Sequence, residues 1–387
     1  MGSLLLALIY VCFISLGLPD SLLGSAWPVL HVEIGVPISF AGIVSTIISL
    51  GTIISSLLSD RMVRKWGSGL ITAVSTAMTA IALFGFSISS EFWMLIVWAI
   101  PYGLGAGGVD AVLNNYVALH YKPQHMSWLH CFWGVGASIS PYIMSFALVR
   151  LENWSAGYLI VSVIQIVLTA IIFLSLPRWK KSVSEAEQTE EVKEEKPLKL
   201  SEILKVPGAL PCFLLFFAYC ALEMTSSLWA SSYLVGARGM EVEIASAFAS
   251  LFYIGITIGR GVNGFLAMKF KDRTLIRAGL AIISVGIVLL LLPLPSIVAL
   301  IGFVVVGLGC APVYPCIIHM TPELFGKERS QAMIGVQMAA AYLGFLLVPP
   351  LVGMIGDLVG IFLLPVCMLV IFILMVIMHE IVVKKTK

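Results

Sequence analysis

Charged side chains are scarce in this sequence, and this scarcity decides the class of protein. Asp, Glu, Lys and Arg make up 11% of the 387 residues, whereas 59% are hydrophobic. A water-soluble chain needs roughly 25% charged residues to cover its surface. We therefore exclude a soluble protein and expect a surface that faces lipid.

Motifs for catalysis and metal binding are also missing. The seven cysteines lie in apolar stretches and form no CxxC pair, which is typical of small buried hydrophobic residues rather than of a disulfide framework or a metal site. The sequence has no His/Cys cluster, no nucleophile motif and no phosphate-binding glycine loop in an aqueous segment. We therefore expect no enzyme, no cofactor, no metal and no nucleic-acid partner.

Long apolar runs account for most of the chain. Because lipid offers no water to backbone groups, these runs must be helices, and each is long enough to cross a hydrocarbon core of about 30 Å. The sequence predicts an all-α membrane protein with twelve transmembrane helices, near 3–30, 38–58, 69–88, 93–118, 126–149, 155–177, 208–233, 244–269, 276–294, 297–320, 331–355 and 359–382.

One connection is much longer than the others. Residues 178–207 are rich in Glu and Lys and poor in aromatic residues, so we expect a flexible or partly helical cytoplasmic linker there. This linker divides the chain into an N-terminal six-helix bundle, 1–177, and a C-terminal six-helix bundle, 208–387.

The distribution of Lys and Arg predicts the orientation. Twenty of the 23 basic residues fall in connections on one side of the membrane, and only Arg150 and Arg238 fall on the other. Arg260 lies inside an apolar run. Because basic residues collect on the cytoplasmic side, we expect a multi-pass protein of the cell inner membrane with both termini in the cytoplasm.

The two predicted bundles repeat each other in parallel. Gly103-Leu-Gly105 in the fourth span matches Gly307-Leu-Gly309 in the tenth, 204 residues later. Asp60-Arg61 and Asp272-Arg273 follow the second and eighth spans, each with a glycine seven residues beyond the Asp. Chance similarity among glycine-rich helices is the alternative. Related halves imply alternating access, in which one bundle rocks against the other around a site at the bilayer midplane.

A charged motif after the second span resembles the signature of the major facilitator superfamily, GxxxDRxGRK. Here it reads Ser56-x-x-x-Asp60-Arg61-Met62-Val63-Arg64-Lys65, with Ser and Val in place of the two glycines. The resemblance implies the major facilitator fold and a cytoplasmic loop that holds the bundles closed through charge contacts. The residues implied for this cytoplasmic gate are Asp60, Arg61, Arg64, Asp272 and Arg273. Ordinary positive-inside charge is the alternative.

Four charged residues lie well inside predicted spans, away from the ends of the spans: Asp20, Asp110, Glu223 and Arg260. Burying an ionised side chain costs at least a few kcal/mol, so each marks a candidate functional site. A carboxylate in a dry cavity can hold a proton until water enters, which is the chemistry of proton coupling. We therefore predict Asp110 and Asp20 as proton-coupling residues. The alternatives are that Asp110 pairs structurally with Arg260 or His130, and that Arg260 simply neutralises Glu223.

Several of these residues stand in runs that resemble the fucose:proton symporter family. The first is Gly17-Leu-Pro-Asp20-Ser-Leu-Leu-Gly24-Ser-Ala-Trp27-Pro28, and the second is Gly107-Gly-Val-Asp110 followed by Asn114-Asn115-Tyr116. His130 with Gly134-x-Gly136, Glu223 with Trp229, and Gly259-Arg260 extend the similarity. In that family acidic residues on the first and fourth helices serve sugar and proton binding, which implies those roles for Asp20 and Asp110. One member of that family has Glu at the second position, and Asp110 is one carbon shorter.

The resemblance implies a monosaccharide:proton symporter. Its sugar would be bound by polar and aromatic residues that lie at a suitable depth in the membrane. Sugars need carboxylate and amide partners for their hydroxyls and an aromatic face for the ring. The predicted substrate-binding residues are Asp20, Asn114, His130, Glu223, Trp229, Asn263, Tyr314 and Gln337. We expect a hexose, protons and membrane lipid as partners of a monomer. The alternatives are a drug or other small-molecule:proton antiporter of the same fold, and a membrane receptor that transports nothing.

Overall fold

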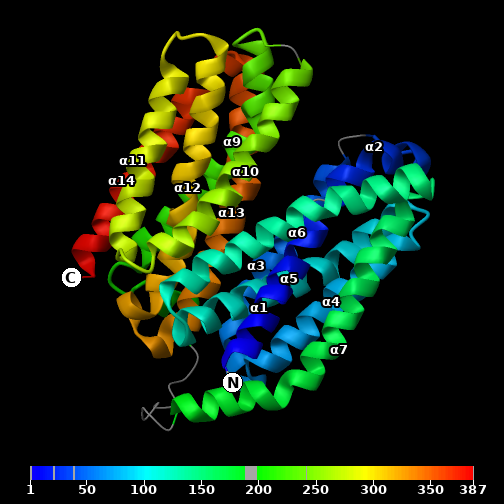
Figure 1. The fold of residues 1–387 in the computed structure, drawn as a ribbon, viewed down its shortest axis with the longest axis vertical. Helices are drawn as coiled ribbons and strands as arrows, with labels where there is room; N and C mark the ends of the chain where they lie inside the picture. The colour runs from blue at the N-terminus through cyan, green and yellow to red at the C-terminus, as the bar shows by residue number, and fades with distance from the viewer. Residues whose placement is uncertain (1, 21, 38–39, 188–197, 241, 387) are drawn as a thin grey trace. The chain divides into compact units, whose positions relative to one another are not determined.

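The prediction of an all-α membrane protein is confirmed. A computed structural model describes residues 2–20, 22–37, 40–187, 198–240 and 242–386, and in these ranges every regular element is a helix (Figure 1). Eleven helical spans in the described part of the chain are long and apolar enough to cross a membrane. The predicted eighth span corresponds to α10, Val242–Leu266.

The described chain forms two compact units. The described residues within 1–116 and 132–197 form the first unit, and those within 117–131 and 198–387 form the second. The end of α5 and the start of α6 therefore pack with the second unit. The helices up to the linker are α1 Gly2–Asp20, α2 Leu22–Ile34, α3 Ala41–Trp66, α4 Ser68–Ser87, α5 Phe92–His120, α6 Pro123–Arg150 and α7 Trp154–Glu187.

The second unit is built mainly from the helices after the linker. They are α8 Leu200–Ile203, α9 Ala209–Gly236, α10 Val242–Leu266, α11 Asp272–Leu291, α12 Ser296–Phe325, α13 Ser330–Leu358 and α14 Leu364–Lys385, with short 3₁₀ helices at Lys327–Arg329 and Ile361–Leu363. Within this unit α9 packs against α13 and α14, and α12 packs against α10 and α11 (Figure 1).

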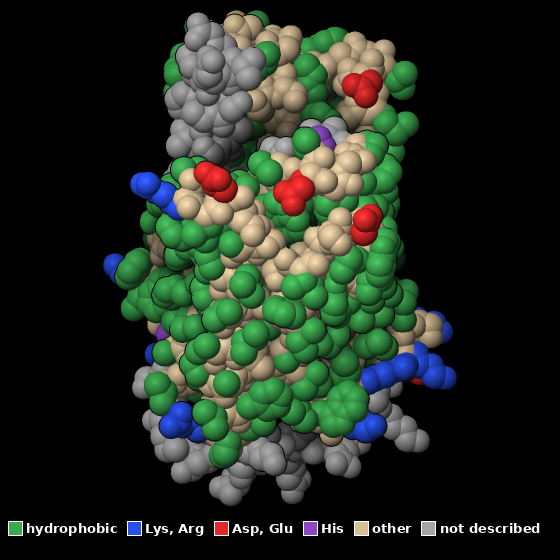
Figure 2. Space-filling view, turned by 90° about the vertical axis from the view of Figure 1, so that its right-hand side faces the viewer, with side chains coloured by type: hydrophobic (Ala, Val, Ile, Leu, Met, Phe, Trp, Pro, Cys, Tyr) green, Lys and Arg blue, Asp and Glu red, His purple; other side chains and the backbone are tan. Residues whose placement is uncertain are grey.

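Apolar side chains cover the outside of the helices as well as the core. Leu174 is 83% exposed and Val149 71% exposed, and hydrophobic side chains gather over the middle and lower part of the face shown in Figure 2. In water such a surface would aggregate, whereas in a bilayer it contacts lipid. The structure thus has the surface that the scarcity of charge predicts.

Close helix crossings repeat in the two halves at the offset seen in the sequence. A Cβ at Gly103 would overlap the carbonyl oxygen of Ile48 on α3, and a Cβ at Gly307 would lie 2.9 Å from that of Phe252 on α10. Each residue of the second pair is numbered 204 higher than its counterpart. Small residues let membrane helices approach until their backbones touch, so the glycine repeat encodes the same α3–α5 and α10–α12 packing twice.

Two predicted boundaries were wrong. The second span was predicted to end at 58, with the charged motif in a loop, but α3 continues to Trp66 and includes that motif. The Arg64 Nε lies 2.9 Å from Asp60 Oδ1, an i,i+4 pair that favours continuing the helix, and Gly67 with φ of 79° ends it. Likewise, α7 runs to Glu187, ten residues into the predicted linker. Residues 188–197 of that linker lie outside the described residues.

Candidate functional site

Asp20 is an exposed carboxylate inside the first membrane span, Leu4–Trp27. It is the last residue of α1. The indole Nε1 of Trp133 on α6 donates to its Oδ2 at 2.8 Å, and the hydroxyl of Tyr102 on α5 donates to its Oδ1 at 3.2 Å. Three helices therefore meet at one carboxylate. Because Asp20 is exposed, a ligand can still reach this carboxylate.

Two glycines bring α6 close enough to α1 for this contact. A Cβ at Gly17 would overlap the carbonyl oxygen of Trp133, and a Cβ at Gly136 would overlap that of Ile14. Each helix therefore has a glycine where it meets the backbone of the other. Because Gly17 lies against the backbone of Trp133 itself, the indole reaches a residue one turn away on α1, Asp20.

Asp110 occupies a different environment, in the middle of α5. It is 6% exposed, and its neighbour one helical turn on, Asn114, is completely buried. The amide Nδ2 of Asn114 donates to Asp110 Oδ1 at 2.8 Å and to the Asp110 carbonyl oxygen at 2.9 Å. Asp110 and Asp20 also lie close enough to interact electrostatically. The first unit thus brings Asp20, Asp110 and Asn114 into one region, one carboxylate exposed and the other enclosed.

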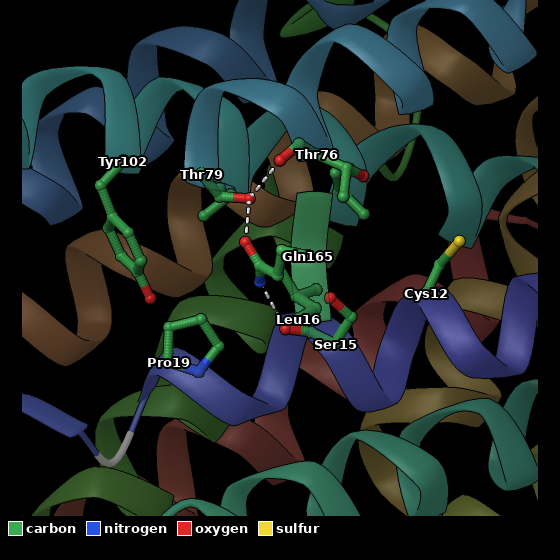
Figure 3. A pocket seen from close by; sticks show the side chains of 10 residues that line it. Cys12, Ser15, Leu16, Pro19, Thr76, Thr79, Tyr102 and Gln165 are labelled. Atoms are coloured by element: carbon green, nitrogen blue, oxygen red, sulfur yellow. Dashed lines mark hydrogen bonds between the residues drawn. The ribbon is translucent and has the colours of Figure 1, made fainter. Parts of the chain in front are cut away.

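A small cavity lies beside this region, next to Pro19 (Figure 3). Its volume of about 10 Å³ is the space of roughly one water molecule, far less than a monosaccharide needs. Gln165 on α7 lines it and joins two other helices, because its Nε2 donates to the Ser15 carbonyl oxygen at 2.8 Å and its Oε1 lies 2.8 Å from the Thr79 hydroxyl. The cavity thus belongs to the packing behind Asp20.

A second cavity, of about 340 Å³, contains none of the predicted site residues. Apolar side chains of α3 and α4 dominate its lining, among them Leu58, Met62, Trp66, Leu70, Val74 and Met78. Leu58, Trp66 and Val74 are also exposed, and this mainly apolar lining offers few partners for the hydroxyl groups of a sugar.

The second unit contains a buried ion pair surrounded by aromatic rings. Arg260 Nη2 on α10 lies 3.5 Å from Glu223 Oε1 on α9, and both side chains are less than 10% exposed. The same nitrogen lies 3.4 Å from the Tyr219 hydroxyl, and the guanidinium lies over the Tyr314 ring at 5.7 Å. The His130 ring packs edge-on against Tyr314, with centroids 4.7 Å apart. The structure therefore brings four of the predicted residues, Glu223, Arg260, His130 and Tyr314, into one cluster.

The remaining predicted substrate residues are engaged by protein groups elsewhere in the second unit. Asn263 donates to the Ser127 hydroxyl at 2.7 Å, and its Oδ1 is buried without a hydrogen-bond partner among the described residues. Gln337 is completely buried, and its Nε2 lies 2.9 Å from the Thr321 hydroxyl. Trp229 donates to the carbonyl oxygen of Pro349 at 2.9 Å, which ties α9 to α13.

The residues predicted as a cytoplasmic gate form different contacts in the two halves. Asp60 is buried and pairs with Arg64 on its own helix, whereas Arg61 is exposed. Asp272, at the start of α11, pairs instead with His319 on α12, with Nδ1 to Oδ2 at 2.7 Å. Arg273, predicted as part of this gate, is half-buried. The repeated aspartate thus has an arginine partner in one half and a histidine partner in the other.

Sequence reasoning missed the partners that position the carboxylates. Tyr102, Gln165 and Tyr219 were not among the predicted site residues, although each contacts or supports one of them. A lone amide within the apolar run 155–177 was a signal for Gln165, since polar residues inside a span are rare. No signal distinguished Tyr102 or Tyr219 from an interfacial tyrosine. Within the described residues, no group of three His, Cys, Asp or Glu side chains could hold a metal ion.

Comparisons with known proteins identify the family. The model of the Major Facilitator Superfamily matches residues 9–251 and 212–386. Bypass of stop codon protein 6 of Saccharomyces cerevisiae is 25% identical over 391 residues, covering 92% of this chain and 77% of that protein. The glucose/mannose transporter GlcP of Bacillus subtilis is 20% identical over 301 residues, covering 77% and 74%.

Solved structures show the same fold. A crystal structure of the major facilitator transporter FucP in the outward conformation superposes with a TM-score of 0.79 at 15% identity, covering 97% of each chain. The predicted resemblance to this superfamily and its fold is therefore confirmed. The chain belongs to the Major Facilitator Superfamily and is a membrane transporter rather than an enzyme.

Proposed function

We propose that the protein is a monosaccharide:proton symporter that works by alternating access, with Asp20 in the sugar site and Asp110 as the principal proton carrier. The observation that carries this proposal is the exposed carboxylate of Asp20 within a membrane span, held by Trp133 and Tyr102. An ionised side chain inside a membrane span costs free energy, so such residues are rare and usually mark functional sites. A binding role accounts for both its exposure and its two fixed donors.

Asp20 has the chemistry that a sugar requires. A carboxylate accepts hydrogen bonds from hydroxyl groups, and its two oxygens have further lone pairs beyond those used by Trp133 and Tyr102. Trp133 is half-buried, so its indole offers an apolar face next to the carboxylate. This combination of a polar anchor and an aromatic face is the usual design of a small-molecule site.

Asp110 has the chemistry that proton coupling requires. It is enclosed, its carboxylate accepts a hydrogen bond from Asn114, and it interacts electrostatically with Asp20. Because two negative charges repel each other, the pair of carboxylates is suited to take up a proton. Binding of a proton at Asp110 would remove that repulsion and leave Asp20 free to accept sugar hydroxyls.

The cluster in the second unit offers further contacts to a sugar. Glu223 and Arg260 lie at 3.5 Å, longer than a charge-assisted hydrogen bond of about 2.8 Å. A hydroxyl group can therefore bridge the pair without a large rearrangement. His130 and Tyr314 add a ring nitrogen and an aromatic surface, and we assign all four to substrate binding. Asn114, Asn263, Gln337 and Trp229 keep secondary roles, because protein groups already engage them.

The relatives support a sugar as cargo. One is named a glucose/mannose transporter, and the E. coli fucose:proton symporter FucP has the same fold, with a TM-score of 0.75 at 15% identity. We further propose that both termini lie in the cytoplasm of a monomer, and that bundles 1–177 and 208–387 rock during transport. The pairs Asp60–Arg64 and Asp272–His319 then lie on the cytoplasmic side, where they stabilise the gate.

A proton-uptake screen tests this function. Purified protein is reconstituted into de-energised vesicles, and the external pH is recorded as monosaccharides are added one at a time. We expect alkalinisation with one sugar, abolished in Asp110→Asn and retained in Asp357→Asn, a matched change at an exposed aspartate near the end of α13. No response to any sugar from folded protein, with competition by amphipathic amines instead, would replace symport by drug:proton antiport.

A further inference from the structure

Pro19 interrupts the hydrogen-bond ladder of α1 immediately before Asp20. Proline has no N–H, so the carbonyl oxygen four residues earlier loses its helical donor. That oxygen belongs to Ser15, a residue that is 3% exposed. A buried carbonyl in a membrane helix needs another donor, because no water competes for it.

Gln165 supplies that donor. Its Nε2 lies 2.8 Å from the Ser15 carbonyl oxygen, and the side chain is 2% exposed. Its Oε1 is fixed from the other side by the Thr79 hydroxyl at 2.8 Å. The Thr79 hydroxyl oxygen also lies 2.9 Å from the Thr76 carbonyl oxygen. Its hydrogen is therefore shared between that carbonyl oxygen and Gln165 Oε1. Figure 3 shows this chain of contacts from α4 through α7 to α1, with Pro19 beside it.

The two sides of Pro19 are therefore held by different groups. On the N-terminal side, Gln165 holds the freed carbonyl of Ser15. On the C-terminal side, Trp133 and Tyr102 hold the carboxylate of Asp20. A proline lets the backbone of α1 take more than one local geometry, because the ladder no longer restrains it. The direction of the Asp20 side chain thus depends on how firmly Ser15 is anchored.

We propose that Gln165 is a positioning residue for Asp20: it replaces the hydrogen bond that Pro19 removes from α1 and so holds the Asp20 carboxylate within reach of Trp133 and Tyr102. This proposal deepens the proposed function and rests on it for the role of Asp20 in transport. Gln165 itself touches neither sugar nor proton. Its effect passes through the backbone of residues 15–20.

The first test measures the position of the carboxylate without any transport. The protein is labelled with ¹⁵N-tryptophan, and the indole resonance of Trp133 is identified by its loss in Trp133→Phe. In Gln165→Met, which keeps the length of the side chain but cannot donate, we expect this resonance to move. In Ser175→Ala, on the same helix, it should stay, because the Ser175 hydroxyl donates to the Ile172 carbonyl oxygen and not to Gln165. An unchanged Trp133 resonance in folded Gln165→Met overturns the proposal.

The second test measures coupling between Gln165 and Pro19. In Pro19→Ala the new N–H can donate to Ser15, so Gln165 becomes dispensable. We expect Gln165→Met to raise the sugar KM about tenfold, the scale of one hydrogen bond to a charged group, and to displace the pH profile of uptake, while the maximal rate changes little. On the Pro19→Ala background the same substitution should raise KM by less than about twofold. Equal effects on both backgrounds contradict the proposal.

The two tests separate this proposal from the proposed function. If the Trp133 resonance moves but no sugar drives proton uptake in the native protein, Gln165 positions Asp20 and the assigned cargo is wrong. If sugar uptake is as described and the resonance stays, the function stands and the positioning role fails. Thr79→Val, which frees the other end of the Gln165 amide, gives the same resonance test if Gln165→Met does not fold.

Discussion

The buried pair of Glu223 and Arg260 allows a quantitative prediction about stability. Replacing Glu223 by Gln keeps the shape of the side chain and removes its charge, which leaves the buried guanidinium without its carboxylate. At 3.5 Å and an effective dielectric constant of about 20, the attraction between the two charges is about 5 kcal/mol. Removing one partner of a buried pair lowers the free energy of unfolding by about 3–5 kcal/mol. Because the contact between Glu223 and Arg260 is long, at 3.5 Å, we expect a loss of about 3 kcal/mol.

Thermal unfolding of the purified protein in detergent measures this cost. We expect Glu223→Gln to lower the midpoint by on the order of 5–10 °C. The double variant Glu223→Leu with Arg260→Met should recover most of that loss, because uncharged side chains carry no desolvation penalty. Arg277→Gln is the matched control: its pair with Glu380, at 2.9 Å, is exposed, and surface pairs contribute little.

The double variant also separates stability from function. If the pair only stabilises the fold, the double variant should transport as the native protein does once it is folded. If Glu223 and Arg260 bind the sugar, the double variant should be stable and inactive, which is the result that we predict. A double variant less stable than Glu223→Gln would refute the electrostatic reasoning, since it would show that the pair contributes net stability.

Two further predictions concern packing. Gly136→Ala places a Cβ on the carbonyl oxygen of Ile14, so we expect a loss of about 1–3 kcal/mol of stability and lower activity in unfolding and uptake assays, whereas Gly42→Ala, with open space around it, should be neutral. Gln337→Leu leaves the buried Thr321 hydroxyl without its amide partner, so a loss of about 1–3 kcal/mol is expected. If Gly136→Ala leaves stability and activity unchanged, the close packing of Gly136 on Ile14 is not required. If Gln337→Leu is more stable than the native protein, the hydrogen bond between Gln337 and Thr321 does not stabilise the fold.

The membrane helices could be predicted because lipid requires them. An apolar run long enough to cross the bilayer has no alternative to a helix, so the order of the spans was correct without any knowledge of packing. The ends were less certain, as α3 and α7 show. The first polar residues after an apolar run show where the membrane ends, but the helix itself can continue into water. Local pairs such as Asp60–Arg64 then determine how far it continues.

The carboxylates of the site were also visible in the sequence, whereas their partners were not. Asp20 and Asp110 stand out because a charge in an apolar run is rare. Trp133 and Tyr102 become partners of Asp20 only because α5 and α6 lie beside α1. Which helices lie side by side becomes visible only in the folded bundle, and the apolar runs of a single sequence do not reveal it. The same holds for Pro19 and Gln165. They are 146 residues apart in the sequence, so nothing in the sequence shows that both act on the carbonyl group of Ser15.

We propose that Asp110 couples the proton gradient to sugar movement. The most direct measurement compares uphill accumulation with exchange in reconstituted vesicles, using the sugar identified by the proton-uptake screen and Asp110→Asn. Because Asn cannot carry a proton, we predict that this variant exchanges internal for external sugar but accumulates none under an imposed pH gradient. Full gradient-driven accumulation by Asp110→Asn would show that Asp110 does not carry the coupled proton.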